Sequence, residues 1–326
     1  MWTLLATAVV VSAVLTWVSR VYALRRRLVD EPGARRSHRV ATPRGGGVGP
    51  VIAFAALITA GGWLGWLGDT DWRLLLASLL SVAAIGAWDD HRPLGAGVRL
   101  VVHIAAGIGV AAAFGLWAEH PLAAVATAGL TVVLVNVWNF MDGIDGIAAT
   151  QAVIVALAGA LLGAPEWAWL SMGCIACVAG FLPFNFPRAR IFMGDVGSGG
   201  MGVILAVLAT GAAMHSEQVA TGALLLFPAS AFLVDSAMTL GRRMLRGEHW
   251  WTAHTQHLYQ HMARRHGHVR VTLAYAAWSL AGLLLALGVA SQPVAVILAS
   301  VMLWYTACAG IWARLQHASK GRSAAA

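Results

Sequence analysis

The chain is a succession of apolar segments of about 17–25 residues, the length that a helix needs to cross a lipid bilayer. Eleven such segments can be drawn, and they cover residues 2–24, 47–68, 73–88, 98–117, 121–140, 143–163, 166–186, 197–214, 219–241, 271–290 and 293–313. Hydrophobic residues make up 59% of the chain and charged residues 11%, against about 45–50% and about 25% in soluble domains. The sequence therefore predicts an all-α polytopic membrane protein with about 11 transmembrane helices, in which residues 1–326 form a single domain.

Lys and Arg are distributed unevenly over the connections, and this asymmetry predicts the orientation. One set of connections, with the helix ends beside them, holds every Lys and Arg except Arg73, and it includes the loops 25–46, 89–97, 187–196 and 242–270. Because positively charged loops stay in the cytoplasm, we expect a periplasmic N-terminus and a cytoplasmic C-terminus. The net charge of +8 then suits anionic lipid headgroups and phosphate-bearing ligands, and it does not indicate a nucleic-acid partner.

Two local features suggest other functions but have simpler explanations. Cys174 and Cys177 form a C-x-x-C inside an apolar segment, and without a second pair of ligands we expect buried thiols there. The first apolar segment has no basic region before it and no clear cleavage site, so we interpret it as a retained helix rather than a signal peptide.

Carboxylates gather where the apolar segments end on the basic side. An ionisable group at membrane depth is costly and is a candidate functional residue. A helix cap alone would explain one of these acids, but several together need a counter-charge, and a hard cation with oxygen ligands, such as Mg²⁺, suits them. The acids at these ends are Asp89, Asp90, Asp142, Asp145 and Asp195, and Asp235 lies inside a further segment.

One of these acidic segments, VNVWNFMDGIDG at residues 135–146, places Asn136, Asn139, Asp142 and Asp145 three residues apart. At helical spacing they would share one side of a helix. We therefore expect one helix end to present Asn139, Asp142 and Asp145 to a single ligand, with Asn136 one turn deeper.

Basic and imidazole side chains lie in the loops of the same side. The segment RRSHRVATPRGGGVG, at residues 35–49, joins Arg39 and Arg44 to three consecutive glycines, and guanidinium groups and glycine backbone both suit phosphate. His254, His257 and His261 are spaced to share one face of a helix. Their spacing also allows zinc, but no H-E-x-x-H pattern is present, so contacts to a diphosphate or an interfacial amphipathic helix are the better interpretations.

Acids, arginines and histidines at one end of a helical bundle suggest that a phosphorylated, water-soluble ligand meets a membrane lipid there. Phosphoryl transfer needs a metal to neutralise the diphosphate, cations to hold its oxygens, and an acceptor held in line. No P-loop, Rossmann unit or nucleophile elbow occurs in the sequence, which excludes those nucleotide-using and hydrolytic designs.

Five sequence pieces resemble, in order, the motifs of the polyprenyl-phosphate N-acetylhexosamine-1-phosphate transferase superfamily. They are TPRGGG at 42–47, DDHRPLGAGVRL at 89–100, NFMDGIDG at 139–146, GDVGS at 194–198 and the histidine-rich loop at 254–261. The last loop looks most like that of the O-antigen initiating enzymes that accept UDP-activated 6-deoxy amino sugars. It lacks the adjacent histidines and following acid of the peptidoglycan enzyme, so we do not expect MurNAc-pentapeptide as donor.

The resemblance implies a transmembrane transferase of the bacterial cytoplasmic membrane. Such an enzyme moves HexNAc-1-phosphate, with FucNAc, QuiNAc or GlcNAc as the sugar, from a UDP-sugar to undecaprenyl phosphate. It releases UMP, uses Mg²⁺ or alternatively Mn²⁺, and initiates O-antigen or another surface polysaccharide. A homodimer is expected from family precedent alone.

The resemblance also implies roles for individual residues. The catalytic group would be Asp89, Asp90, Asp142, Asp145 and His257, and the metal ligands Asp195, Asp90 and Asp142. The substrate-binding group would be Arg39, Arg44, Asn136, Asn139, His254 and His261. Which of Asp142 and Asp145 contacts the metal is open, as is whether Arg39 or Arg44 replaces a lysine of the peptidoglycan enzyme.

Two other classes of protein carry acids in a polytopic chain. A cation- or proton-coupled transporter would use them as a relay near the bilayer midplane, whereas these acids lie at one end of the segments. A catalytically silent assembly protein would tolerate the loss of Asp89, Asp90 or Asp195.

Overall fold

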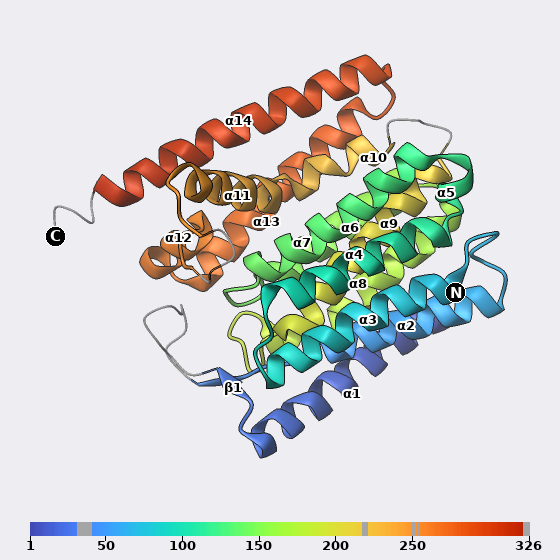
Figure 1. The fold of residues 1–326 in the computed structure, drawn as a ribbon, viewed down its shortest axis with the longest axis horizontal. Helices are drawn as coiled ribbons and strands as arrows, with labels where there is room; N and C mark the ends of the chain where they lie inside the picture. Colours follow the sequence, from blue (N-terminus) through green and yellow to red (C-terminus); the bar gives the residue numbers. More distant parts are fainter. Residues whose placement is uncertain (31–40, 217–220, 250–251, 253, 322–326) are drawn as a thin grey trace.

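Long helices account for most of the described residues (Figure 1). The computed structural model describes residues 1–30, 41–216, 221–249, 252 and 254–321. Its first part contains α1 (Trp2–Arg26), β1 (Val29–Asp30), β2 (Thr42–Pro43), α2 (Val48–Trp63), α3 (Trp72–His91), α4 (Ala96–Ala113), α5 (Leu116–Glu119) and α6 (Pro121–Met141). The second part contains α7 (Ile147–Leu162), α8 (Pro165–Asn185), α9 (Gly194–Met214), α10 (Thr221–Leu224), α11 (Leu226–Leu245), α12 (Leu258–His266), α13 (His268–Val289) and α14 (Val294–Gly321).

Eight of the described helices are long and apolar enough to cross a bilayer, and they are α1, α3, α4, α6, α8, α9, α13 and α14. The apolar helices α2 and α7 are shorter, and α11 is not among the eight. Each of the eleven predicted segments overlaps one of these eleven helices. The prediction of an all-α polytopic membrane protein is confirmed, while the number eleven and the orientation stay predictions.

Helix α9 runs through the centre of the bundle, with 89% of its apolar stretch buried, and it packs against α3, α6 and α7. Glycines allow this close packing, as they commonly do between membrane helices. A Cβ on Gly202 of α9 would lie 2.4 Å from the Cα of Val135, and one on Gly86 of α3 would lie 2.4 Å from the carbonyl oxygen of Asp195. The end of α3 is therefore held directly against the start of α9.

The glycine-rich segment after β2 is fixed along the chain that leads into α9. β1 and β2 pair antiparallel, and Phe192 N–H donates to the Pro43 carbonyl at 2.8 Å. Gly46 and Gly47 donate in turn to the carbonyls of Phe192 and Met193, at 2.9 and 2.8 Å. These backbone bonds hold the TPRGGG segment beside the acids of α3 and α9.

Helices α11, α13 and α14 pack together, and the short helix α12 contacts all three. Figure 1 shows α12 and β1 at the same end of the bundle. The histidine-rich loop, which precedes α12, therefore lies at the same end of the bundle as the glycine-rich segment, which follows β2. Elsewhere in the bundle, Cys174, Cys177 and Cys308 are buried free thiols, as predicted.

Candidate active site

Asp90 is a buried carboxylate that holds the first turn of α9 in place. Its side chain is 4% exposed, and its two oxygens accept from the backbone N–H groups of Asp195 and Val196, both at 3.2 Å. Arg44 donates to the Asp90 carbonyl oxygen, and its Nε lies 3.8 Å from Asp90 Oδ1. Asp90 thus caps α9 from a different helix and ties the glycine-rich segment to α3.

Asp89 and Asp195 converge on one cationic group, the guanidinium of Arg99. Arg99 Nη1 lies 2.8 Å from Asp89 Oδ2 and 3.2 Å from Asp195 Oδ2. The other oxygen of Asp89 accepts from Leu94 N–H at 2.5 Å. The Asp195 side chain is 32% exposed and the Asp89 side chain 12%. The two carboxylates are close enough to share one cation, and part of Asp195 is open to a ligand.

Asp142 lies at the end of α6 and close to this group. It is the residue that follows the last helical residue, Met141. Burial, together with the negative charge of Asp90, raises the pKa of Asp142 from 3.8 to about 7. A carboxylate in this position would be stabilised in its ionised form by a nearby cation.

Asp145 has a different partner. Its Oδ2 lies 3.2 Å from His268 Nδ1, and its carbonyl oxygen accepts from the Thr272 hydroxyl at 2.8 Å. Both partners belong to α13. The two candidates in this turn therefore separate: Asp142 lies toward Asp90, whereas Asp145 connects the turn to α13.

The expected single helical face of this segment is wrong, because α6 ends at Met141. Gly146 has φ +72°, and its N–H donates to Asn185 Oδ1 at 3.0 Å, so the chain turns before α7. Within α6, Asn139 Nδ2 donates to Ser198 Oγ of α9 at 3.2 Å. Asn136 Nδ2 donates to the Val132 carbonyl at 2.8 Å, one turn below the acids.

The histidines also do not share one helical face, because α12 begins only at Leu258. His257 is the extended residue before the helix and is 3% exposed. The ring of His254 stacks on it with centroids 4.9 Å apart. His261 lies within α12, where its Nδ1 is 2.9 Å from Arg264 Nη2. The loop therefore offers a stacked pair of imidazoles and a separate third one.

The electrostatics of this pair argue against a charged His254. Burial, assisted by the nearby His257 and Arg243, lowers the pKa of His254 from 6.5 to about 4. His254 is therefore neutral at pH 7 and acts as a hydrogen-bonding group. The other predicted basic residue, Arg39, lies outside the described residues.

Comparison with known proteins supports the resemblance noted in the sequence. Residues 72–213 match the family described as glycosyl transferase family 4. A decaprenyl-phosphate N-acetylglucosaminephosphotransferase of Mycobacterium tuberculosis is 30% identical over 83% of this chain and 78% of its own length. The chain belongs to the polyprenyl-phosphate N-acetylhexosamine-1-phosphate transferases.

Two further relatives carry the names of two different transferases. An undecaprenyl-phosphate α-N-acetylglucosaminyl 1-phosphate transferase of Yersinia pestis is 26% identical over 84% of this chain and 81% of its own length. A phospho-N-acetylmuramoyl-pentapeptide-transferase of Symbiobacterium thermophilum is 31% identical over 64% of this chain and 71% of its own length. The first of these aligns over more of the transferase chain.

The donor set of the transferase suits a hard divalent cation. Asp89 and Asp195 already direct one oxygen each at a single cationic nitrogen. Within the ranges that the structure describes, no three His, Cys, Asp or Glu side chains form a metal site by themselves. Two carboxylates are a donor set that Mg²⁺ can use, since Mg²⁺ commonly takes one or two carboxylates and completes its shell with water and ligand phosphates.

Sequence reasoning missed one member of this site, Arg99. Arg99 lies within an apolar helix, ten residues after Asp89. Its charge was used only to predict the orientation of the chain in the membrane, and the sequence does not show which side chains it contacts. Two signals were available: Arg99 belongs to the motif DDHRPLGAGVRL at 89–100, and it lies at the start of α4 on the same end of the bundle as the acids. A long side chain there reaches back to two carboxylates from two other helices.

Proposed function

We propose that this transferase moves HexNAc-1-phosphate from a UDP-sugar to undecaprenyl phosphate, giving undecaprenyl-diphosphate-sugar and UMP. The relatives are named for the same class of transfer, with decaprenyl or undecaprenyl phosphate and N-acetylglucosamine. The observation that carries the proposal is the meeting of three acidic helix ends, from α3, α6 and α9, with Arg44 and Arg99. Such a site suits a diphosphate and a metal at the end of a membrane bundle.

The proposed reaction needs no strong base. An oxygen of the lipid phosphate is already ionised, and it attacks the phosphorus that bears the sugar. A new P–O bond forms while the bond from that phosphorus to the bridging oxygen breaks, and UMP leaves with the bridging oxygen. Catalysis then consists of holding the two phosphates in line and neutralising their charge.

In this proposal Mg²⁺ is bound by Asp195 and Asp89, with Asp142 as a third candidate ligand, while Asp90 holds the first turn of α9 in place. When bound, the metal neutralises charge on the diphosphate. Arg44 and Arg99 provide cationic hydrogen-bond donors for phosphate oxygens. Asn139 contributes an amide on the same side, and His254 and His257 lie beside the Asp142 turn, where they can contact the diphosphate or sugar.

The finer assignments of the proposal concern the sugar, the pathway and the location. The sugar is FucNAc, QuiNAc or GlcNAc: the histidine-rich loop resembles that of enzymes accepting 6-deoxy amino sugars, whereas the relatives are named for N-acetylglucosamine. The same loop favours a role at the first step of O-antigen or related polysaccharide synthesis. The positively charged loops favour an active site on the cytoplasmic face of a bacterial inner membrane. The family resemblance favours a homodimer.

Transport is the second candidate function for a chain with intramembrane acids. A cation or proton relay would place its carboxylates near the middle of the helices. Here Asp89 and Asp90 close α3 and Asp195 opens α9. The position of the acids at helix ends therefore favours the transferase.

The test combines purified protein, undecaprenyl phosphate, Mg²⁺ and a panel of labelled UDP-sugars. We expect UMP release with at least one UDP-HexNAc, loss of release in EDTA, and loss in Asp195→Asn. Asp71→Asn is the matched control, because Asp71 caps the opposite end of α3 and Asn also caps helices well. Absence of UMP with every donor, or full activity in Asp195→Asn, would overturn the proposal.

A further inference from the structure

Asp235 is a fully buried carboxylate that the proposed chemistry does not use. It is 0% exposed and accepts hydrogen bonds from four helices. Three donors are side chains: the Thr239 hydroxyl of α11 at 3.1 Å, the Tyr275 hydroxyl of α13 at 2.8 Å and the Trp312 indole N–H of α14 at 3.0 Å. From α12 they are the backbone N–H groups of Leu258 at 2.9 Å and Tyr259 at 3.1 Å. A charge buried at this depth persists only where donors satisfy it in this way.

Two of those donors make Asp235 the cap of α12. The first N–H groups of a helix have no partner within it, and a negative charge near them is favourable. Asp235 Oδ1 and Oδ2 each take one of these N–H groups. His257, the residue just before them, lies with its Nδ1 3.7 Å from Asp235 Oδ1. The position of the imidazole pair is thus tied to a carboxylate on another helix.

Arg243, two turns further along α11, holds the preceding part of the same loop. Its guanidinium donates to the Glu248 carboxylate at 2.9 Å and to the carbonyl oxygens of His249 and Thr252, at 2.8 and 3.1 Å. Residues eight apart in a helix lie on roughly the same face. Asp235 and Arg243 together therefore hold the described parts of the loop at two points on one face of α11.

Tyr259 carries the position of α12 onward to the Asp142 turn. Its hydroxyl donates to the Phe140 carbonyl at 3.0 Å. A Cβ on Gly143 would lie 2.2 Å from that hydroxyl, so the tyrosine rests against the glycine beside Asp142. The Phe140 ring also stacks near His257, with centroids 6.4 Å apart. A shift of α12 would therefore move His257 and the Asp142 turn together.

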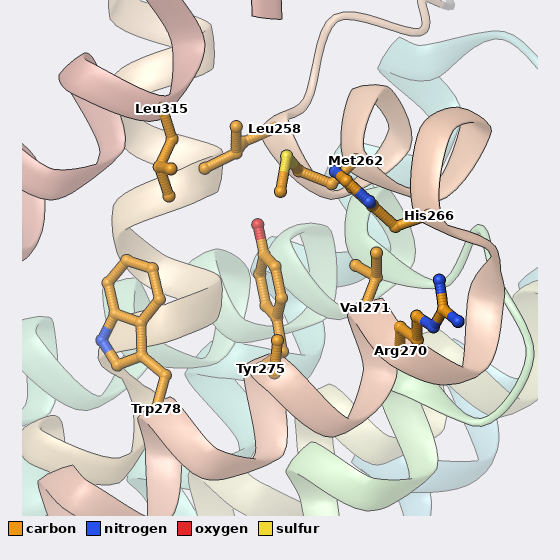
Figure 2. A pocket seen from close by; sticks show the side chains of 9 residues that line it. Leu258, Met262, His266, Arg270, Val271, Tyr275, Trp278 and Leu315 are labelled. Atoms are coloured by element: carbon orange, nitrogen blue, oxygen red, sulfur yellow. The ribbon is translucent and has the colours of Figure 1, made fainter. Parts of the chain in front are cut away.

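The apolar packing around α12 is incomplete on one side. A cavity of about 340 Å³ lies there, between α12, α13 and α14. Figure 2 shows Leu258 and Met262 of α12 facing it, with Trp278 and Leu315 across from them. The Tyr275 hydroxyl, which binds Asp235, points from the cavity floor toward α12 (Figure 2). Because α12 is only partly packed on this side, its polar contacts contribute to fixing where it lies.

We propose that Asp235 is a positioning residue that holds the His254–His257 segment against the Asp142 turn by capping α12, with Arg243 fixing the other part of the loop. The role in catalysis rests on the proposed function, whereas the placement of the loop does not. Loss of the cap releases the first turn of α12 and exposes His257, while the membrane bundle stays folded.

A backbone substitution tests the cap without touching Asp235. Leu258→Pro removes the Leu258 N–H, and proline is otherwise well suited to the first residue of a helix. His257 has φ −63° and ψ 146°, a conformation that a following proline favours. Leu258→Ala is the matched control, because it also truncates the side chain but keeps the N–H. Tyr275→Phe is a second control, because it removes a donor of α13 from the same carboxylate.

The readout is modification of individual histidines by diethyl pyrocarbonate, measured by mass spectrometry well below the unfolding temperature. The exposed His120 serves as internal reference. We expect His257 to react about tenfold faster in Leu258→Pro than in Leu258→Ala, which equals about 1.4 kcal/mol in the opening equilibrium. We expect a larger change in Asp235→Asn and a value near wild type in Tyr275→Phe.

Activity is measured separately with the active donor. We expect Leu258→Pro and Asp235→Asn to raise KM for the UDP-sugar more than they lower kcat, because the loop is displaced rather than removed. Equal His257 reactivity in Leu258→Pro and Leu258→Ala would overturn the capping role. If Asp235→Asn does not fold, the comparison of Leu258→Pro with Leu258→Ala still tests the capping role. An inactive wild type would refute the proposed function alone, since the labelling needs no turnover.

Discussion

Asp89, Asp90 and Asp195 lie close to one another in space, yet the structure gives Asp90 a different role. Asp90 is almost completely buried and accepts the first two N–H groups of α9 that follow Gly194. Asp195 shares Arg99 with Asp89 and is one-third exposed. We therefore predict that Asp90→Asn lowers stability and that Asp195→Asn does not, although both lower activity.

The magnitude follows from the two hydrogen bonds of Asp90. A hydrogen bond to a charged group contributes about 1.5–3 kcal/mol. Asparagine keeps one acceptor oxygen but turns an N–H₂ group toward the other backbone N–H, so at least one bond is lost. Asparagine is also cheaper to bury than a carboxylate, which offsets part of the loss. The expected net cost is about 2 kcal/mol, or a fall in Tm of about 4–8 °C at the 2–4 °C per kcal/mol of larger domains.

Asp195→Asn should leave the free energy of unfolding unchanged or raise it. Arg99 keeps its 2.8 Å contact with Asp89, and one of two neighbouring negative charges disappears. We expect a Tm within about 1 °C of wild type, or higher, because removing one of the two neighbouring negative charges offsets the weakened contact with Arg99, and a partly exposed ion pair contributes at most about 1 kcal/mol.

The assay is thermal unfolding of the detergent-purified protein, followed by intrinsic tryptophan fluorescence in EDTA, with UMP release measured in parallel at two temperatures. Asp90→Asn should retain part of its activity at the lower temperature, whereas Asp195→Asn should be inactive at both. An unchanged Tm in Asp90→Asn would refute the capping argument. Equal destabilisation in both variants would show that the two acids do not have separate roles.

Three further predictions concern the same site. Arg99→Met should lower Tm in EDTA by about 2–4 °C, because it removes ion pairs that contribute about 1 kcal/mol. Mg²⁺ should restore much of this loss by taking the place of the guanidinium between Asp89 and Asp195. An equal fall in Tm with and without Mg²⁺ would contradict the idea that the metal and the guanidinium share one position. Gly194→Ala should lower Tm and activity, because Gly194 has φ +75° and its Cβ would lie 2.7 Å from Asp90 Oδ2; Gly95→Ala, with open space around it, is the control. Since burial and Asp90 raise the pKa of Asp142 from 3.8 to about 7, the folded state holds this proton more tightly than the unfolded state, and stability falls as pH rises through that window. In EDTA, Asp142→Asn should therefore gain stability relative to wild type between about pH 4 and pH 7, and a constant difference in Tm would contradict the raised pKa.

The sequence was sufficient to predict the class of fold and the end of the bundle where the site lies. The membrane helices can be predicted without knowing any contacts, because the thickness of the bilayer sets the length of an apolar segment. The acids could then be assigned to helix ends from their positions in those segments. The family motifs then named most of the residues that the structure brings together. Asp89, Asp90 and Asp195 needed only the assumption that helix ends of one side meet.

The errors came from places where the local pattern competes with tertiary contacts. The i, i+3 spacing of Asn139, Asp142 and Asp145 predicted one helical face, but Gly146 adopts φ +72° and is bonded to Asn185 of α8, so the helix stops before Asp142. The histidine spacing likewise predicted one face. There the start of α12 is set by Asp235, which lies more than twenty residues earlier on another helix.

Asp90 and Asp235 solve the same physical problem in the same way. The N-cap positions of α9 and α12 are Met193 and His257, so neither helix begins with a Ser, Thr, Asp or Asn cap. In α12 the Gln260 side chain adds a local contact, because its Oε1 accepts from His257 N–H at 3.3 Å. In each case a buried carboxylate on a neighbouring helix accepts N–H groups of the first turn instead, where the positive end of the helix dipole favours it. The helix start is thereby fixed relative to the neighbouring helix rather than to its own loop. Asp195 and His257, the residues placed by these two caps, are the ones proposed to meet the metal and the donor. A carboxylate inside an apolar segment is thus a signal for a helix start elsewhere in the chain that lacks a Ser, Thr, Asp or Asn at its N-cap position.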